Sequence, residues 1–302
     1  MHFRQTLWAL SSASLPFSSA LAVEKRQLPP GPLFLKAPAL DKRFQPAMDF
    51  DTDSCYNTPA MGPPPNNDLN TGLEPKNSLA SLTDDCRREE MLERANVYSR
   101  QRCNNGYCAI MYAYYFQKDQ TGVAGPLRGH RHDWEHVVVW VRMSDTFVSH
   151  VAVSAHKGYT IKQNHEIQWT PTENGPASDG HPAVVYHKDG GSTHAFRFAN
   201  GADFGNGGPE NHWRKWIFGP LIGHYGWDSV EQRTRMYTEG GAEDPWGAAD
   251  LALNDESFKN NLGKAKPGEI NFDVNNDDEQ TNKISEVEDC EMFGGAPGCA
   301  NN

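Results

Sequence analysis

Seven consecutive residues, 129–135, bring together two imidazoles, two carboxylates, a guanidinium and an indole in the order Gly-His-Arg-His-Asp-Trp-Glu. They lead directly into residues 135–141, whose β-branched and aromatic side chains favour a buried strand over a helix. Side chains on a strand alternate between its two faces, so Asp133 and Glu135 are expected on one face, about 6.6 Å apart at Cα. Two carboxylates that close together indicate a binding site for a cation.

The donor types in this stretch determine which cation it would bind. Asp119, at the end of the preceding strand candidate, would supply a third carboxylate. Oxygen donors favour Mg2+ or Ca2+ over Zn2+, because hard cations prefer carboxylates and water and tolerate a single imidazole. On residue types alone, two acids and two histidines near a strand end more often form an ordinary hydrogen-bonded cluster. The metal site therefore needs further support.

Strand candidates recur along the chain, with turn-forming residues between them. They cover residues 107–116, 135–141, 148–155, 159–163, 183–187 and 194–198. This spacing predicts an all-β layered structure. One helix is expected, from the N-cap candidates at 83–85 to about residue 98, because Met91, Ala95 and Tyr98 would share one face.

Composition and charge exclude some classes of protein. The chain has 302 residues, of which 37% are hydrophobic, and a formal net charge of -11. This charge argues against a nucleic-acid-binding protein and against polybasic attraction to anionic membranes. Residues 266–302 hold nine acidic and two basic residues, a contribution of -7, so the rest of the chain carries only -4. We predict that this acidic tail is largely disordered.

The amino-terminal region has the composition of an export signal. An apolar run rich in small residues follows a basic start and ends in Ala-Leu-Ala at 20–22, which matches a signal-peptidase site. We therefore predict a signal peptide over 1–22 and a secreted, extracellular protein, since the run is too interrupted for a transmembrane anchor. The proline-rich residues 23–42 are interpreted as a propeptide or an extended lead-in. Residues 43–265 are then the folded domain.

Two other features receive structural interpretations. Residues 49–53, Asp-Phe-Asp-Thr-Asp, are similar to a calcium loop but lack the glycine turn and the distal Glu of an EF-hand. We interpret them as an acidic turn that is solvated or hydrogen-bonded locally. His156, His181 and His194 lie near strand ends, where a histidine is more often structural than part of a site.

Two runs of sequence together resemble a known family. Residues 129–135 match the signature of the necrosis- and ethylene-inducing-peptide-like proteins, a family of secreted microbial toxins. Residues 109–119, Ala-Ile-Met-Tyr-Ala-Tyr-Tyr-Phe-Gln-Lys-Asp, are similar to that family's other diagnostic run. The resemblance covers roughly residues 44–265. It implies a mainly β fold, a single-domain β-sandwich flanked by a few helices and similar to fungal lectins and pore-forming cytolysins.

The resemblance also implies a site and an activity. Asp119, His130, Asp133 and Glu135 would surround a divalent cation, Mg2+ or Ca2+, on which cytolytic activity depends. The partner would be the sugar headgroup of glycosylated sphingolipids at the outer leaflet of the plant plasma membrane, which the toxin disrupts. No covalent catalysis is expected, because the sequence contains neither a Gly-x-Ser-x-Gly elbow nor a paired nucleophile and base.

The other residues of the motif are expected to support the site. Arg131 and His132 would orient the carboxylates, and Trp134 would pack into the core. The ten residues 120–129 between Asp119 and His130 are more than is common in the family. Both ends of this segment are fixed by strands and closure entropy grows slowly with length, so Asp119 is still expected to reach the cation.

Two alternative functions stay open. The chain would be a non-cytolytic, carbohydrate-binding member of the family if its altered loop 120–128 prevents lysis. It would be a secreted metal-dependent hydrolase if His130 or His132 activates water with the cation. Leakage from plant-lipid vesicles would separate the toxin from the non-cytolytic member. Release of a product from sphingolipid headgroups or cell-wall glycans would favour the hydrolase. The intact run 109–112 makes recognition by plant immune receptors a further expectation.

The six cysteines are an even number, which favours disulfide bonds in an exported chain. Cys103 and Cys108 would close a tight turn, and a zinc site there would lack a second cysteine pair. The family resemblance implies that Cys55 pairs with Cys86. The remaining two cysteines, whose closeness suggests a local bridge in the tail, are Cys290 and Cys299.

Overall fold

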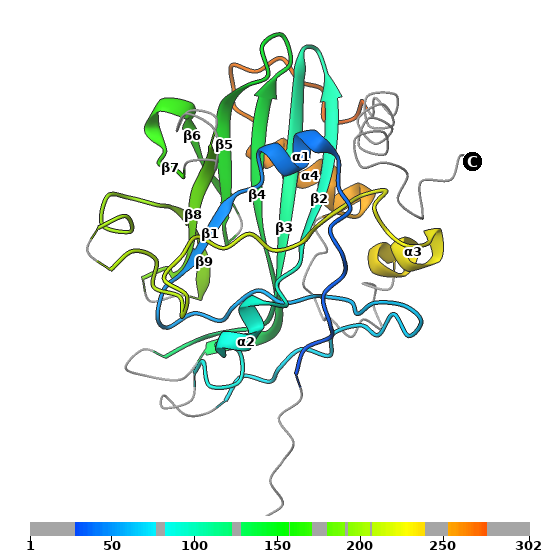
Figure 1. Cartoon of the computed structure of the whole chain (residues 1–302). Helices are drawn as coiled ribbons and strands as arrows, with labels where there is room; N and C mark the ends of the chain where they lie inside the picture. Colours follow the sequence, from blue (N-terminus) through cyan, green and yellow to red (C-terminus); the bar gives the residue numbers. More distant parts are fainter. Residues whose placement is uncertain are drawn as a thin grey trace, which may run out of the picture.

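The chain folds into two β-sheets with a few short helices, as the computed structural model shows (Figure 1). This confirms the predicted mainly β fold. The structure describes residues 28–76, 82–122, 128–156, 158–170, 180–190, 193–205, 207–238 and 253–276. The α-helices among these residues are α1 (Ala39–Arg43), α2 (Glu89–Leu92), α3 (Val230–Thr238) and α4 (Asp255–Ala265). None of the helices described is long and apolar enough to cross a membrane.

The larger sheet has six strands in the order β10-β2-β3-β4-β5-β6. Its strands are β2 (Val97–Asn104), β3 (Tyr107–Thr121), β4 (Arg128–Arg142), β5 (Phe147–Ala155), β6 (Gly158–Gln163) and β10 (Leu221–Gly223). The long antiparallel hairpin of β3 and β4 forms its centre (Figure 1). The predicted strands in this part of the chain are all present, and β3 and β4 are longer than expected.

The smaller sheet has the order β1-β8-β7, with β9 paired to β8. Its strands are β1 (Ala47–Phe50), β7 (Trp169–Thr170), β8 (His181–Lys188) and β9 (His194–Phe198). β1 runs parallel to β8, whereas β9 is antiparallel to it. The strands predicted at 183–187 and 194–198 are confirmed.

Aromatic residues fill the space between the two sheets. Alternate side chains of β3 point towards the smaller sheet, because successive residues of a strand face opposite sides. Phe116 stacks on Tyr186 with ring centroids 3.8 Å apart. Tyr114 meets Phe196 edge-on at 5.2 Å. These buried contacts join the end of β3 to β8 and β9, so the core fixes the end of the β3–β4 hairpin at which the sequence motif lies.

The outer face of the larger sheet carries a second apolar cluster. Trp134 is only 6% exposed there and packs against Tyr98 and Tyr115, with ring centroids 5.9 and 5.2 Å away. Helix α4 covers this face with the buried side chains of Phe258 and Leu262. The interpretation of Trp134 as a core residue is confirmed.

The helix expected between residue 83 and residue 98 is wrong over most of its length. Only α2, Glu89–Leu92, is helical, and Tyr98 lies in β2, where it pairs with Ala113 of β3. The sequence of β2 contains many polar residues, so it lacks the apolar pattern that would predict a strand. Arg100 and Arg102 stack on the ring of Phe258, at 4.7 and 5.1 Å, so two cations are buried on a strand face that would otherwise be apolar.

The folded region extends beyond both ends of the predicted 43–265 domain. Leu33 is 5% exposed, and Lys36 forms a parallel bridge with Ile222 of β10, so the lead-in pairs with the sheet. At the other end, Ile270 and Phe272 are 3% and 4% exposed and join the outer cluster. The predicted disorder therefore does not apply to residues 266–276. The predicted signal peptide, residues 23–27 and residues 277–302 lie outside the described residues.

Two disulfide bonds agree with the expected pairing. Cys55 is bonded to Cys86, and Cys103 is bonded to Cys108 across the β2–β3 hairpin. The expected bridge in the tail concerns residues outside the described part of the chain, namely Cys290 and Cys299.

Candidate metal centre

Three of the four predicted ligands converge where the β3–β4 hairpin approaches the smaller sheet. Asp119 of β3 lies directly opposite His130 of β4 in the strand register. Asp119, His130 and Asp133 each offer a ligand atom, and these atoms all lie within 4.8 Å of one another. Two carboxylates and one imidazole at this separation are compatible with Mg2+ or Ca2+, which prefer oxygen donors and tolerate a single imidazole.

An irregularity in β4 allows His130 and Asp133 to face the same site. Residues three apart in a regular strand point to opposite faces, so these two side chains could not otherwise converge. Between them His132 adopts a φ of 59°, in the left-handed region. Asn, Asp and His are the non-glycine residues that most often tolerate this conformation. The histidine at the centre of the motif therefore redirects the strand at the site.

Gly129 allows β4 to pass close to the main chain of Asp119. Its φ is 156°, and an added Cβ atom would lie 2.3 Å from the carbonyl oxygen of Asp119. Real Cβ atoms do not approach an oxygen so closely, so any other residue would force the two strands apart. The first residue of the motif is thus required by the proximity of Asp119.

The hydrogen bonding of His130 determines which ring nitrogen is available. Its Nδ1 atom lies 2.7 Å from the carbonyl oxygen of His132. A carbonyl oxygen can only accept, so Nδ1 carries the proton and Nε2 keeps a lone pair. A metal-binding histidine is commonly oriented through its other nitrogen in this way. The main chain of His132 therefore orients the His130 ring and leaves Nε2 as the nitrogen with a lone pair.

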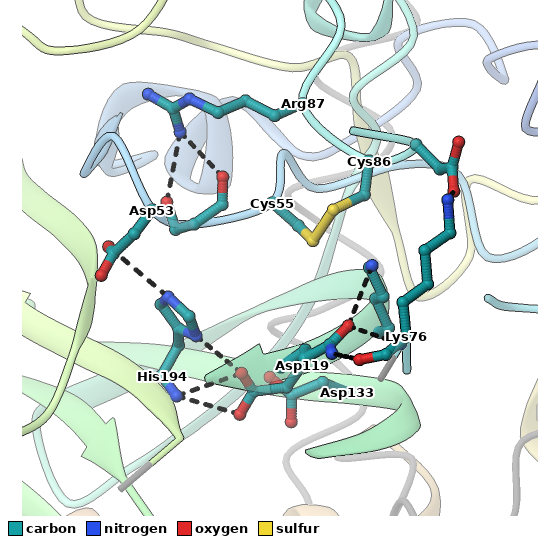
Figure 2. The surroundings of a disulfide bond; sticks show 12 residues. Asp53, Cys55, Lys76, Cys86, Arg87, Asp119, Asp133 and His194 are labelled. Atoms are coloured by element: carbon teal, nitrogen blue, oxygen red, sulfur yellow. Dashed lines mark hydrogen bonds and ion pairs between the residues drawn. A yellow bond between two sulfur atoms is a disulfide. The ribbon is translucent and has the colours of Figure 1, made fainter. Parts of the chain in front are cut away.

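His194 of β9 holds Asp119 from the smaller sheet (Figure 2). The main-chain nitrogen of His194 donates to both carboxylate oxygens of Asp119, at 3.1 and 2.9 Å. Its Nδ1 atom lies 2.7 Å from Oδ1 of the same carboxylate. Burial opposes the charge on this ring, but the hydrogen bonds to Asp119 and the proximity of Asp53 raise the pKa of His194 to about 9.

Sequence reasoning did not place His194 at this site. We expected a structural histidine, as is the case for His156, which pairs with Asp189 at 3.0 Å. The distinction between the two depends on the packing of β9, in the smaller sheet, against the end of β3 in the larger sheet. No local spacing in the sequence reveals that packing. The only sequence signal was the position of His194 at the start of a predicted strand.

Asp133 lies in an environment that disfavours its charge in the absence of a cation. Burial and the nearby Asp119 raise its pKa to about 6, while the hydroxyl of Tyr186 donates to Oδ2 at 2.9 Å. A carboxylate that is half-buried beside a second carboxylate would gain from a neutralising cation. The local electrostatics are therefore consistent with a cation site.

Glu135 lies beside the three converging residues and is not a member of that group. Its carboxylate accepts a hydrogen bond from the hydroxyl of Ser154 on the neighbouring strand β5. Burial and the charge of Asp133 raise the pKa of Glu135 well above its ordinary value. The structure thus places Glu135 next to Asp133, as the strand alternation predicted, but bonded to β5.

Among the described contacts, the side chains of Arg131 and His132 bond to groups other than the carboxylates of the site. Arg131 pairs with Glu74 and donates to the carbonyl oxygen of Thr71 at 3.2 Å. The His132 ring is buried on the outer face of the sheet, where its Nδ1 lies 2.6 Å from the hydroxyl of Tyr115. The orienting contribution of His132 comes from its carbonyl oxygen, which accepts from His130.

The acidic turn at 49–53 is hydrogen-bonded to protein groups. Asp49 accepts from the side chain of Asn211 at 3.1 Å. Asp51 pairs with Arg197 at 3.2 Å. These two carboxylates are hydrogen-bonded, but their partners lie far along the chain and not within the turn, so the bonding is not local as expected. The turn shows no convergent set of donors among the described residues.

Comparison with known proteins identifies the family. The family model described as necrosis inducing protein (NPP1) matches residues 39–265. The chain therefore belongs to this family, as the two sequence motifs predicted.

Individual relatives agree with this assignment. The necrosis-inducing protein NPP1 of Phytophthora nicotianae is 37% identical over 124 residues, which cover 39% of this chain and 47% of the relative. The chain thus spans about half the length of the curated relatives it matches. The structure of NLPPya in complex with glucosamine has a TM-score of 0.56 and 25% identity, covering 79% of this chain and 96% of that one. The structure of the non-toxic HaNLP3 protein, with a TM-score of 0.60 and 23% identity over 80% and 99% of the chains, shows the shared fold alone.

Proposed function

We propose that this protein is a secreted necrosis-inducing cytolysin. It binds sugar headgroups of plant plasma-membrane sphingolipids with the help of a divalent cation and disrupts the membrane. The observation that carries this proposal is the convergence of Asp119, His130 and Asp133 in a member of the NPP1 family. Two carboxylates and one imidazole suit Mg2+ or Ca2+. Glu135, beside Asp133, would complete the acidic surroundings.

Each side chain of the site has a defined part in this proposal. Asp119 is fixed through both oxygens by His194, and Tyr186 donates to Asp133. His130 presents the lone pair of Nε2, because its Nδ1 is bonded to the main chain. A bound cation would supply a positive centre that attracts the hydroxyl oxygens of a sugar. The chain's own contribution is to hold the ligands in place before the sugar arrives.

The exposure of the three ligands indicates the direction from which a sugar would approach. Asp119 is 2% exposed, Asp133 is half-buried and His130 is exposed. The protected side of the cluster therefore faces β9, and the open side lies at His130. A headgroup at a membrane surface would reach the cation from the open side.

A solved relative supports a sugar as the ligand class. The structure of NLPPya has been determined in complex with glucosamine. NLPPya is 25% identical to this chain, and the match covers 96% of NLPPya and 79% of this chain. In the present proposal the corresponding ligand is a sugar of a glycosylated sphingolipid at the outer leaflet. Secretion through a signal peptide at residues 1–22 would bring the protein to that leaflet.

Plant immune receptors are a second proposed class of partner. The run that would be recognised begins with residues 109–112, which are 0% exposed in β3. A receptor could not contact these side chains in the intact sheet. Recognition would therefore require a fragment released from the fold. A synthetic peptide covering 109–135 should then elicit a response that the intact protein, protected by protease inhibitors, does not.

The experiment that tests the proposed binding is co-flotation with vesicles. Vesicles with and without plant glycosylated sphingolipids are mixed with the mature protein in Mg2+ or Ca2+, or in a chelator. We expect binding only with the sphingolipid and the cation, and loss of binding in Asp133→Asn. Asp145→Asn is the control, because Asp145 is a carboxylate in the turn that follows β4, at the opposite end of that strand from the site, where it pairs with Arg142 at 2.7 Å. Equal flotation of parent and Asp133→Asn would refute the cation-assisted mode.

A further inference from the structure

A second carboxylate approaches the far side of the His194 ring. Oδ1 of Asp53 lies 3.7 Å from Nε2 of His194, while Nδ1 of the same ring lies 2.7 Å from Oδ1 of Asp119 (Figure 2). The ring is 3% exposed and the Asp53 side chain is 47% exposed. Asp53, His194 and Asp119 therefore form a row that runs from the surface to the proposed cation site.

The acidic turn that carries Asp53 is held firmly in the fold. Cys55, two residues further on, is bonded to Cys86. Arg87 follows Cys86 and donates to the carbonyl oxygen of Ser54 at 2.8 Å. Two independent attachments thus fix the main chain immediately after Asp53 (Figure 2). The position of its carboxylate relative to β9 is defined by these attachments.

We propose that Asp53 is a positioning residue for the cation site and acts through His194. The inference rests on the proposed cation-binding function. A separation of 3.7 Å is too long for a strong hydrogen bond. It is close enough for electrostatic attraction between the Asp53 carboxylate and the His194 ring, which is buried away from solvent. Because carboxylates face both ring nitrogens, the plane of the ring is fixed and Nδ1 stays directed at Asp119. Asp53 does not contact the cation itself.

The electrostatics of Asp53 agree with this geometry. Its contact with His194 lowers the pKa of Asp53 below the ordinary value, against the opposing effect of burial. A contact between exposed groups would contribute little to any property of the protein. Here one partner is buried and bonded to a ligand residue, so the effect should appear at the cation site.

The test compares cation affinity in Asp53→Asn, Asp53→Glu and Glu269→Gln. Glu269 provides a matched control, because its Oε1 lies 2.8 Å from Nε2 of His150, a histidine whose side chain is 10% exposed, while Glu269 is 59% exposed. His150 pairs with Trp140, ten residues along β4 from His130. Dissociation constants for Mg2+ and Ca2+ are measured by calorimetry after circular dichroism has shown that each variant is folded.

We expect Asp53→Asn to weaken cation binding roughly tenfold, at the lower end of the effect usual for residues that orient a ligand. Asp53→Glu should restore most of the affinity, and Glu269→Gln should match the parent. The ring nitrogen signals of His194, observed by NMR of 15N-histidine-labelled protein in a chelator, should move in Asp53→Asn and not in Glu269→Gln.

The outcomes separate the two proposals. If the parent and Asp53→Asn bind the cation equally, or if the His194 ring signals do not move, the positioning role of Asp53 is overturned and the proposed function stands. If the parent itself binds no divalent cation, the proposed function fails and the role of Asp53 in cation binding fails with it.

Discussion

Asp119 and His130 lie directly opposite each other in the β3–β4 ladder, although the ten residues 120–129 separate them in the chain. The next pairs outward are Gln120 with Gly129 and Thr121 with Arg128, in the same register. The loop that we expected to be longer than in the family therefore leaves the pairing intact as far as Thr121 and Arg128. It does not displace Asp119, because the strands on both sides fix the register before the loop begins.

The cation-free protein should show an unusual pH dependence at Asp133. The folded pKa, raised to about 6 by burial and by Asp119, lies above the ordinary value of 3.8. The folded state therefore binds this proton more tightly than the unfolded state, and the contribution of Asp133 to stability rises as pH falls from about 6 towards 4. In a chelator, Asp133→Asn should melt above the parent at pH 7, and the difference should shrink as the pH falls through 6.

The stabilisation caused by cation binding should weaken as the pH falls, whereas the contribution of Asp133 in the cation-free protein should grow. Protons and the cation compete for the same carboxylate oxygens, so the rise in melting temperature caused by Mg2+ or Ca2+ should diminish between pH 7 and pH 5. Scanning calorimetry with and without the cation measures both effects. A cation-induced shift that stays constant over this range would contradict the assignment of Asp133 as a ligand.

Gly129→Ala should damage both the fold and the site. The new Cβ atom would meet the carbonyl oxygen of Asp119 at 2.3 Å, so the strands must separate there. We expect a loss of about 1–3 kcal/mol in the free energy of unfolding, measured in urea, together with weaker cation binding. Gly158→Ala is the control, because no heavy atom lies within 4 Å of its added Cβ. A similar loss in the two variants would show that Gly129 is not sterically constrained.

The two disulfide bonds should differ in their contribution to stability. The Cys55–Cys86 bond spans 31 residues and the Cys103–Cys108 bond spans 5. Loop entropy predicts losses of about 4 and about 2 kcal/mol when each pair is replaced by alanine. Urea unfolding of the two double variants provides the comparison, and both replace buried cysteines, so packing losses are similar. A larger loss in the free energy of unfolding on removal of the shorter bridge than of the longer one would contradict the entropic account.

The sequence predicted most strands because strands depend on local pattern, whereas the convergence of Asp119, His130 and Asp133 followed from the family resemblance. The apolar run at 135–141 marks a buried strand without any knowledge of its neighbours. The motif places His130 and Asp133 close in the chain, and the preceding strand ends at Asp119. The proximity of these residues depends only on the pairing of two consecutive strands in one hairpin.

Contacts between the sheets could not be predicted in the same way. His194 and Tyr186 reach the site from β9 and β8, and nothing near Asp119 in the sequence indicates either residue. Strand β2 was missed because Arg100 and Arg102 occupy positions where an apolar residue would signal a strand. Their stacking on Phe258 depends on the packing of α4, which lies about 150 residues further along the chain.

The most direct test of the proposed function is dye leakage from vesicles that contain plant glycosylated sphingolipids, with Mg2+ or Ca2+ present. The mature parent protein is compared with Asp133→Asn and Asp145→Asn, all shown to be folded. We predict leakage by the parent and by Asp145→Asn, none by Asp133→Asn, and none from vesicles without the sphingolipid. Binding of the parent without leakage, while an active toxin leaks the same vesicles, would contradict cytolysis and leave carbohydrate binding alone.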